Sequence, residues 1–171
     1  TEQKSTVTVT QVKVPRNDGT NYADYLLAGI TVKAIAIDGA NRKWVGTEKN
    51  GLYLLSADGI EEIHHFTTEN SPLLSDEIQS IAVDDETGIV YIGTPKGLIA
   101  YQSDATEAQP SFEESKVRAF PNPVKPDYQG YINIVGLMMD SQVKITDAYG
   151  SLIHEGTSVG GSFSWNGRDN K

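Results

Sequence analysis

The sequence predicts an all-β protein, and three observations lead to that prediction. The apolar residues are mainly Val, Ile and Leu, with eight Tyr beside them, and these residue types favour strands. Sixteen Gly and seven Pro divide the chain into short segments, as many strands joined by turns require. The third observation is an internal repeat with an offset of about 46 residues, which indicates a fold of successive similar units.

The repeat consists of three matched blocks that occur twice in the same order. Each copy begins with an alternating apolar segment that ends in Asp. It continues with an aromatic residue, an aliphatic residue and Gly-Thr, and it closes on Gly-Leu. The blocks are residues 32–38 and 78–84, residues 44–47 and 91–94, and residues 51–53 and 97–99.

One unit of the repeat contains four predicted strands, which we expect at residues 32–38, 44–47, 52–56 and 60–67. The Asp-Gly and Asn-Gly pairs between them favour tight turns. Four antiparallel strands in about 46 residues are typical of one blade of a β-propeller.

The second unit has predicted strands at residues 78–83, 89–93 and 98–102, and we expect its fourth strand near residues 110–114. The alternating stretch 5–14 is predicted to be the outer strand of a preceding blade. We therefore assign residues 1–102 to the C-terminal blades of a propeller, as about two blades plus one extra strand.

The repeat pattern resembles a known family. The segments 32–52 and 78–98 both fit the order alternating strand, Asp, aromatic-aliphatic-Gly-Thr and Gly-Leu, which is similar to the two-component regulator propeller repeat of Bacteroidetes-type proteins. This resemblance implies an extracytoplasmic protein.

The composition changes after Gln102. Residues 103–116 are polar and are predicted to be a linker. Short apolar strands follow at residues 131–135, 142–146, 151–154 and 163–165, with turn residues between them. We assign residues 117–171 to a second all-β unit.

This second unit resembles the small immunoglobulin-like β-sandwich of flagellar-hook-capping proteins and of the C-terminal domains of type IX secretion proteins. The order of propeller and sandwich is similar to that of PorZ-like proteins of Bacteroidetes. Because the strands that follow the last motif in that family are not in this chain, we expect the sandwich to be truncated. The residues that carry the resemblance are Phe120, Pro121, Asn122, Pro123, Trp165, Asn166 and Gly167.

Composition and charge exclude several classes of function. The net charge of −9 opposes binding to phosphate backbones, so we expect no nucleic-acid partner. The absence of Cys excludes disulfides and thiolate chemistry. No segment is apolar enough over its length to span a bilayer. Because the chain begins at Thr1, we expect it to be a fragment whose upstream blades are missing.

Two pairs of equivalent residues stand out in the repeat. Trp44 and Tyr91 share one position and are predicted to pack between blades, with a sugar-binding platform as the alternative. Asp38 and Asp84 share another position, and their duplication indicates a structural task such as capping a turn. A catalytic residue would need no copy in each blade.

No catalytic or metal constellation is found, so we expect no enzyme activity, no metal and no cofactor. The neighbours His64 and His65 point to opposite faces of a predicted strand. The run Asp84-Asp85-Glu86 is contiguous and lacks the alternation of a calcium loop.

Two functions are the leading hypotheses, and a weaker third is a lyase or hydrolase whose catalytic residues would lie upstream of Thr1. The first is a non-catalytic binding or scaffold protein of the cell envelope, periplasmic or at the cell surface, linked to type IX secretion or surface attachment. Its partners would be envelope proteins or surface polysaccharide. The alternative is the glycan-sensing ectodomain of a hybrid two-component system. Because two blades leave sheet faces open, we also expect self-association unless upstream blades cover them.

Overall fold

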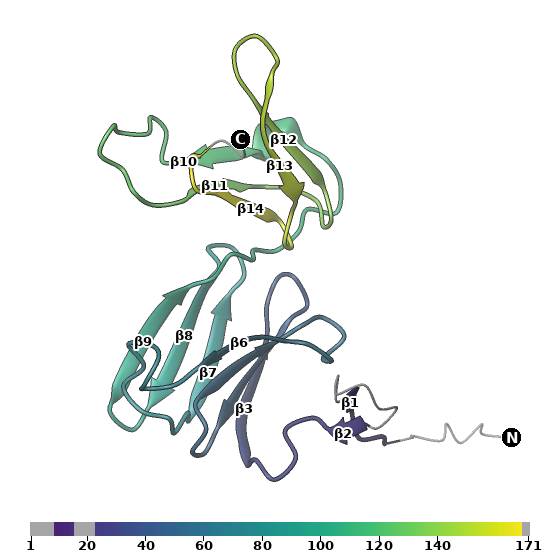
Figure 1. Ribbon diagram of the computed structural model, residues 1–171, viewed down its shortest axis with the longest axis vertical. Coiled ribbons are helices and arrows are strands. Elements are labelled where there is room, and N and C mark those ends of the chain that lie inside the picture. The colour runs from purple at the N-terminus through teal and green to yellow at the C-terminus, as the bar shows by residue number, and fades with distance from the viewer. Residues whose placement is uncertain (1–8, 16–22, 169–171) are drawn as a thin grey trace, which may run out of the picture.

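Figure 1 shows the computed structural model of the chain, whose described residues are 9–15 and 23–168. These residues form short antiparallel β-sheets and one short 3₁₀ helix, Glu114–Lys116. The sheets of the propeller part and the sheets of the sandwich lie at opposite ends of the molecule. The predicted fold class, a partial propeller followed by a small β-sandwich, is confirmed.

The first repeat unit forms one four-stranded antiparallel sheet in the order β3-β4-β5-β6. Each strand pairs with the strand that comes next in the chain, which is the arrangement of a propeller blade. The two middle strands, β4 and β5, are buried along nearly their whole length, so both faces of the sheet are covered there. Its strands are β3 (Val32–Ile37), β4 (Lys43–Thr47), β5 (Leu52–Leu55) and β6 (Glu62–Phe66).

The second unit forms a three-stranded sheet in the order β7-β8-β9. The strands are β7 (Ser80–Asp84), β8 (Ile89–Thr94) and β9 (Gly97–Gln102). The fourth strand that we expected at residues 110–114 is wrong, because that segment has no strand and leads into the 3₁₀ helix. Pro110 has no amide to donate to a ladder, and the segment connects to the sandwich instead.

The core of the propeller part lies between these two sheets. Trp44, Leu52 and Leu54 of the first sheet face Val90 and Ile92 of the second, and all five are buried. Leu73 and Ile78, from the connection between the sheets, complete this core. The backbone also joins the two units, since the amide of Ile78 donates to the carbonyl of Thr47 at 2.8 Å.

The described residues before the first sheet form a small hairpin of β1 (Lys13–Pro15) and β2 (Ala23–Tyr25). The strand predicted at residues 5–14 lies partly outside the described residues, and within them only Lys13 and Val14 of that stretch are in a strand. After β2, the turn at residues 26–30 covers the outer face of the first sheet, with Leu26, Leu27 and Ile30 packed over Val45, Tyr53 and Leu55.

The sandwich contains two sheets, with orders β10-β11-β14 and β12-β13. The ring of His154 lies 5.8 Å from that of Phe163, so side chains of the two sheets meet across the interior. Predicted and observed strands agree closely here, and residues 142–146 agree at both ends. The strands are β10 (Arg118–Phe120), β11 (Ile132–Val135), β12 (Gln142–Thr146), β13 (Leu152–Thr157) and β14 (Ser162–Trp165).

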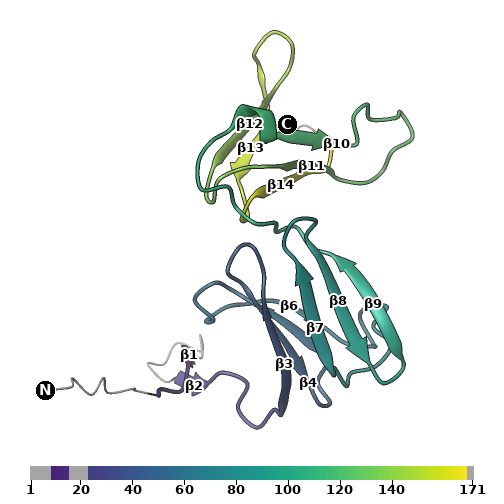
Figure 2. The ribbon, with the colours of Figure 1, turned by 180° about the vertical axis from the view of Figure 1, so that it is seen from behind.

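The first half of the segment predicted to be a linker packs against both the propeller part and the sandwich. Ser103, Ala105 and Thr106 are buried. The amide of Glu107 donates to the carbonyl of Asp85 at 2.7 Å, and the amide of Gly161 donates to the carbonyl of Thr106 at 2.8 Å. We call residues 103–109 the junction segment; Figure 2 shows this crossing from behind.

Candidate functional site

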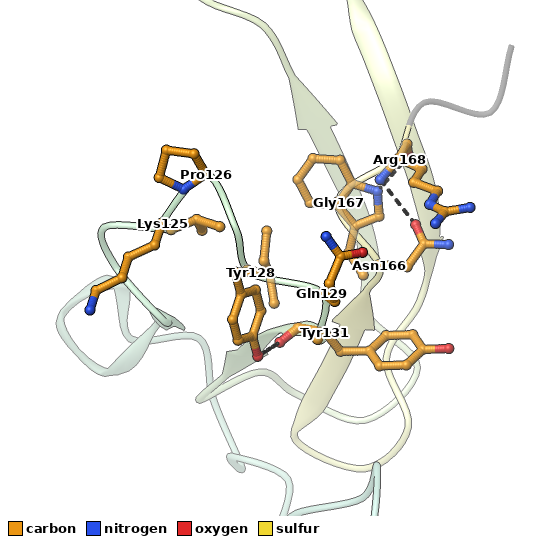
Figure 3. A pocket seen from close by; sticks show the side chains of 12 residues that line it. Lys125, Pro126, Tyr128, Gln129, Tyr131, Asn166, Gly167 and Arg168 are labelled. Carbon is orange, nitrogen blue, oxygen red and sulfur yellow. Dashed lines mark hydrogen bonds between the residues drawn. The ribbon is translucent and has the colours of Figure 1, made fainter.

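The main candidate site is a pocket of about 710 Å³ in the sandwich. Two parts of the chain line it: residues 124–126 and 128–132, on the long loop from β10 to the start of β11, and residues 165–168, from the end of β14 onward. Figure 3 shows Tyr128 and Gln129 of the loop on the side of Asn166 and Gly167, whereas the side chain of Lys125 extends away from this group. We call this cavity the aromatic pocket, after Tyr128, Tyr131 and Trp165.

The loop that carries the two tyrosines begins with the motif Phe120-Pro121-Asn122-Pro123. The peptide bonds before Pro121 and Pro123 are cis. The two prolines directly follow β10, which ends at Phe120. Tyr128 folds back on this loop, and its hydroxyl donates to the carbonyl of Tyr131 at 2.9 Å (Figure 3). This bond holds the phenol of Tyr128 at the pocket wall.

The opposite wall is the turn that contains Trp165, Asn166 and Gly167. The indole Nε1 of Trp165 donates to the carbonyl of Arg168 at 2.8 Å. The side-chain oxygen of Asn166 accepts the amide of Arg168 at 3.0 Å. Gly167 has φ of +74°, a left-handed conformation that glycine adopts without strain. The motif therefore forms a closed turn that places Arg168 at the pocket.

The charged side chains that line the pocket are cationic, although Asp127 lies on the same loop outside the lining. The described lining contains Lys125 and Arg168 but no carboxylate, whereas the whole chain has a net charge of −9. The lining also offers the amide side chains of Gln129 and Asn166, which can donate and accept hydrogen bonds. The pocket is thus suited to an anionic ligand that carries hydroxyl groups.

A second hollow of about 570 Å³ shares Tyr128 and Tyr131 with the aromatic pocket. It extends to Tyr101, Gln102 and Asp104 at the end of β9 and the start of the junction segment. Burial raises the pKa of the Tyr101 phenol, and the charge of Asp104 raises it further. The two tyrosines therefore lie between a surface of the sandwich and a surface of the propeller part.

The equivalent aromatics Trp44 and Tyr91 lie in different surroundings. Trp44 is fully buried between the sheets, with its ring 5.7 Å from that of Tyr101 and stacked on Phe66 at 6.2 Å. Tyr91 is exposed on the outer face of the second sheet. A ligand has no access to the ring of Trp44, and the structure does not bring the two aromatics together.

Asp38 and Asp84 both accept amides of the turn that follows them. Oδ1 of Asp38 accepts the amides of Ala40 and Arg42 at 3.1 and 3.0 Å. Oδ1 of Asp84 accepts those of Glu86 and Thr87 at 3.1 and 3.3 Å. Bonds from the hydroxyl and the amide of Thr87 hold the pKa of Asp84 below its usual value.

Asp38 alone is also part of a buried network. Its Oδ2 accepts Nε of Arg42 at 2.9 Å and the indole Nε1 of Trp44 at 3.1 Å. Arg42 extends into the junction segment, where Nη2 lies 2.9 Å from both Ser103 Oγ and Asp104 Oδ1. Asp38 and Arg42 are both nearly inaccessible, so this pair connects the first sheet to the junction segment.

The pKa of Asp85 is raised, whereas that of its neighbour Asp84 is lowered. Burial raises the pKa of the Asp85 carboxyl, and the charges of Asp38, Glu107 and Asp84 raise it further. Its Oδ1 has no hydrogen-bond partner within the described part of the chain.

Within the described residues, no three His, Asp or Glu side chains gather as a metal centre would require.

Several residues of these sites were not singled out in the sequence. Lys125, Tyr128, Tyr131 and Arg168 line the pocket, and Arg42 pairs with Asp38. A signal was present for the tyrosines, because residues 128–131 place two aromatics in a polar, Pro- and Gly-containing loop. Aromatics on such a loop are candidates for binding, because binding residues are disproportionately found on loops. Within the described residues, no helix is long and apolar enough to cross a bilayer.

Comparison with known proteins finds a solved structure that is similar in both sequence and fold. No protein-family model matches the chain, and no curated protein does either. Among solved structures, PorZ of Porphyromonas gingivalis, described as an essential bacterial surface component of the type IX secretion system, is 38% identical over 94% of this chain, with a TM-score of 0.56. This chain spans 21% of the length of that PorZ chain.

A second solved structure is the extracellular domain of a putative hybrid two-component system from B. thetaiotaomicron. It is 18% identical over 80% of this chain, which spans 22% of it, and its TM-score of 0.38 is too low to support an argument. The predicted resemblance to PorZ-like proteins is confirmed by the first match. The chain is therefore similar in sequence and fold to about a fifth of that PorZ chain.

Proposed function

We propose that this chain is a non-catalytic binding module of the bacterial cell envelope, and that its aromatic pocket binds an anionic saccharide. One observation carries the proposal: Tyr128, Tyr131 and Trp165 surround a cavity with two cationic side chains and no carboxylate in its described lining.

The side chains of the pocket match the groups of such a ligand. Aromatic faces can stack against the apolar face of a sugar ring, while Lys125 and Arg168 pair with a carboxylate or phosphate. The amides of Gln129 and Asn166 suit hydroxyl groups. Stacking, charge pairing and hydrogen bonding together support a binding role for the pocket.

The location and the wider role are supported by the likeness to PorZ. That protein is described as a surface component of the type IX secretion system. We propose a location at the cell surface or in the periplasm, and a link to type IX secretion or surface attachment. Surface labelling of intact cells of the source bacterium tests the location, and labelling only after lysis would contradict exposure at the surface.

The ligand is tested by calorimetry on the full chain with an alginate oligosaccharide, which carries a carboxylate on each sugar, and with maltohexaose, which is neutral. We expect binding of the alginate probe only. Tyr131→Ala and Arg168→Gln should each weaken it about tenfold, as loss of one stacking or charged contact does. Lys144→Gln, on β12 and exposed, is the matched control. Equal binding by all variants would reject the pocket as the site.

A further inference from the structure

The second hollow, of about 570 Å³, continues the aromatic pocket toward the propeller part. Tyr128 and Tyr131 line both cavities, so a ligand in the aromatic pocket can extend past these tyrosines into the second hollow. Figures 1 and 2 show the β10–β11 loop, which carries both tyrosines, on the same side of the molecule as β9. The propeller part adds His64 of β6 and Tyr101 of β9 to the lining, and their rings can contact a sugar.

Bonds to both units hold the part of the second hollow that the junction segment forms. Nη2 of Arg42 lies 2.9 Å from Ser103 Oγ and from Asp104 Oδ1. The carbonyl of Asp104 accepts the hydroxyl of Ser162, in the sandwich, at 2.6 Å. Because these groups are already fixed in place, a ligand bound there would lose little free energy in ordering them.

The side chains of the second hollow suit neutral sugar units. Its described lining has no Lys or Arg and contains the carboxylate of Asp104, which disfavours an anionic group at this place. The side-chain oxygen of Asn133 accepts the hydroxyl of Ser164 at 2.7 Å, and the amide nitrogen of Asn133 can therefore donate to a sugar hydroxyl. The aromatic pocket, by contrast, has the cation Arg168 and no carboxylate in its described lining.

We propose that the two cavities are successive subsites for one oligosaccharide, with an acidic sugar in the aromatic pocket and neutral sugars in the second hollow. This inference rests on the proposed function and adds the length, the composition and the direction of the ligand. Such a ligand contacts the sandwich through the aromatic pocket and the propeller part through His64 and Tyr101. The saccharide is therefore held by both units at once.

The test is calorimetry on the full chain with glucuronosyl-xylose, glucuronosyl-xylotriose and neutral xylotetraose. We expect glucuronosyl-xylotriose to bind about tenfold more tightly than glucuronosyl-xylose, because its additional neutral units reach the aromatic and polar groups of the second hollow. Xylotetraose should bind more weakly than glucuronosyl-xylotriose, which has the same length, because it has no carboxylate to pair with Arg168.

Two variants, one in each unit, locate the source of the difference between the acidic probes. His64→Ala on β6 and Asn133→Ala on β11 should each remove most of this difference, while the affinity for glucuronosyl-xylose stays that of the parent. Circular dichroism checks that both variants are folded. Glu62→Ala is the matched control and should keep the difference, because Glu62 is exposed on the same strand as His64 but lies outside the hollow.

The outcomes separate this inference from the proposed function. If alginate binds but the neutral units of glucuronosyl-xylotriose add no affinity, or if the difference survives in both variants, the inference is overturned and the proposed function stands. If neither alginate nor the acidic xylan probes bind, the proposed function fails, and the inference fails with it.

Discussion

At the scale of residues, two equivalent aspartates show how one repeat position can serve different needs. Both cap the turn after an inner strand, but only Asp38 faces an arginine and an indole in a buried network. In the turn after Asp84, the hydroxyl of Thr87 donates instead to the carboxylate at 2.7 Å near the surface. The sequence reveals the shared position, whereas the difference depends on Arg42, which has no counterpart in the repeat pattern.

Removal of each carboxylate should separate these two roles. We expect Asp38→Ala to lower the free energy of unfolding by about 3 kcal/mol, because it leaves the guanidinium of Arg42 buried without its main partner. Asp84→Ala, the matched control, should cause a clearly smaller loss. Urea unfolding followed by tryptophan fluorescence measures both. Equal losses would contradict a special role of the Asp38–Arg42 pair.

At the scale of elements, the strands of the first sheet and the sandwich could be predicted, since alternation and turn residues act locally. The fourth strand of the second sheet could not. A strand at residues 110–114 was expected because the first unit has four strands, but the chain leaves the sheet there to reach the sandwich. The close approach of the two sheets was also hidden, because it depends on a glycine, Gly46, whose neighbour lies 32 residues later in the chain.

Gly46 tests that packing. A Cβ built on Gly46 would lie 2.5 Å from Cγ2 of Ile78, so Gly46→Ala should destabilise the protein by about 1–3 kcal/mol through overpacking. In an Ile78→Ala background the same substitution should cost much less, because the obstructing methyl group is absent. A double-mutant cycle by thermal unfolding measures the coupling. Simple additivity of the two substitutions would show that the sheets do not meet at this point.

At the scale of the whole molecule, the arrangement of the two units was the least predictable feature. A polar segment of the composition of residues 103–116 is typical of a linker, and nothing local shows that its first half is buried. The aromatic pocket shares this property, since its walls come from residues about 40 positions apart. The motif at Trp165 drew attention to one wall, but its partners on the loop at residues 124–132 required the fold.

The junction also makes stability depend on pH through Asp85. Its pKa is raised, so its protonated form favours the folded state, and that contribution is lost as the pH rises through the raised pKa. Asp85→Asn should therefore stabilise the protein at pH 7 by roughly 0.5 kcal/mol after solvent screening. The gain should vanish below an ordinary Asp pKa of about 3.8.

Urea unfolding of Asp85→Asn and of the parent protein, at pH 7 and at a pH below about 3.8, measures the difference in unfolding free energy. Glu86→Gln, at the exposed neighbour, is the control and should leave the unfolding free energy unchanged at both. A gain for Asp85→Asn that persisted at low pH would show that the carboxylate charge is not its cause.

The junction segment has a practical consequence for anyone who divides this protein. A sandwich that began at residue 117 would lose the carbonyl of Thr106 that accepts the amide of Gly161, and the amide of Gln109 that donates to the carbonyl of Leu137. Ser162 would also lose the carbonyl of Asp104, which its hydroxyl contacts at 2.6 Å. The shortest version of the sandwich that keeps these hydrogen bonds therefore starts near residue 103. It includes the segment that the composition predicts to be a linker.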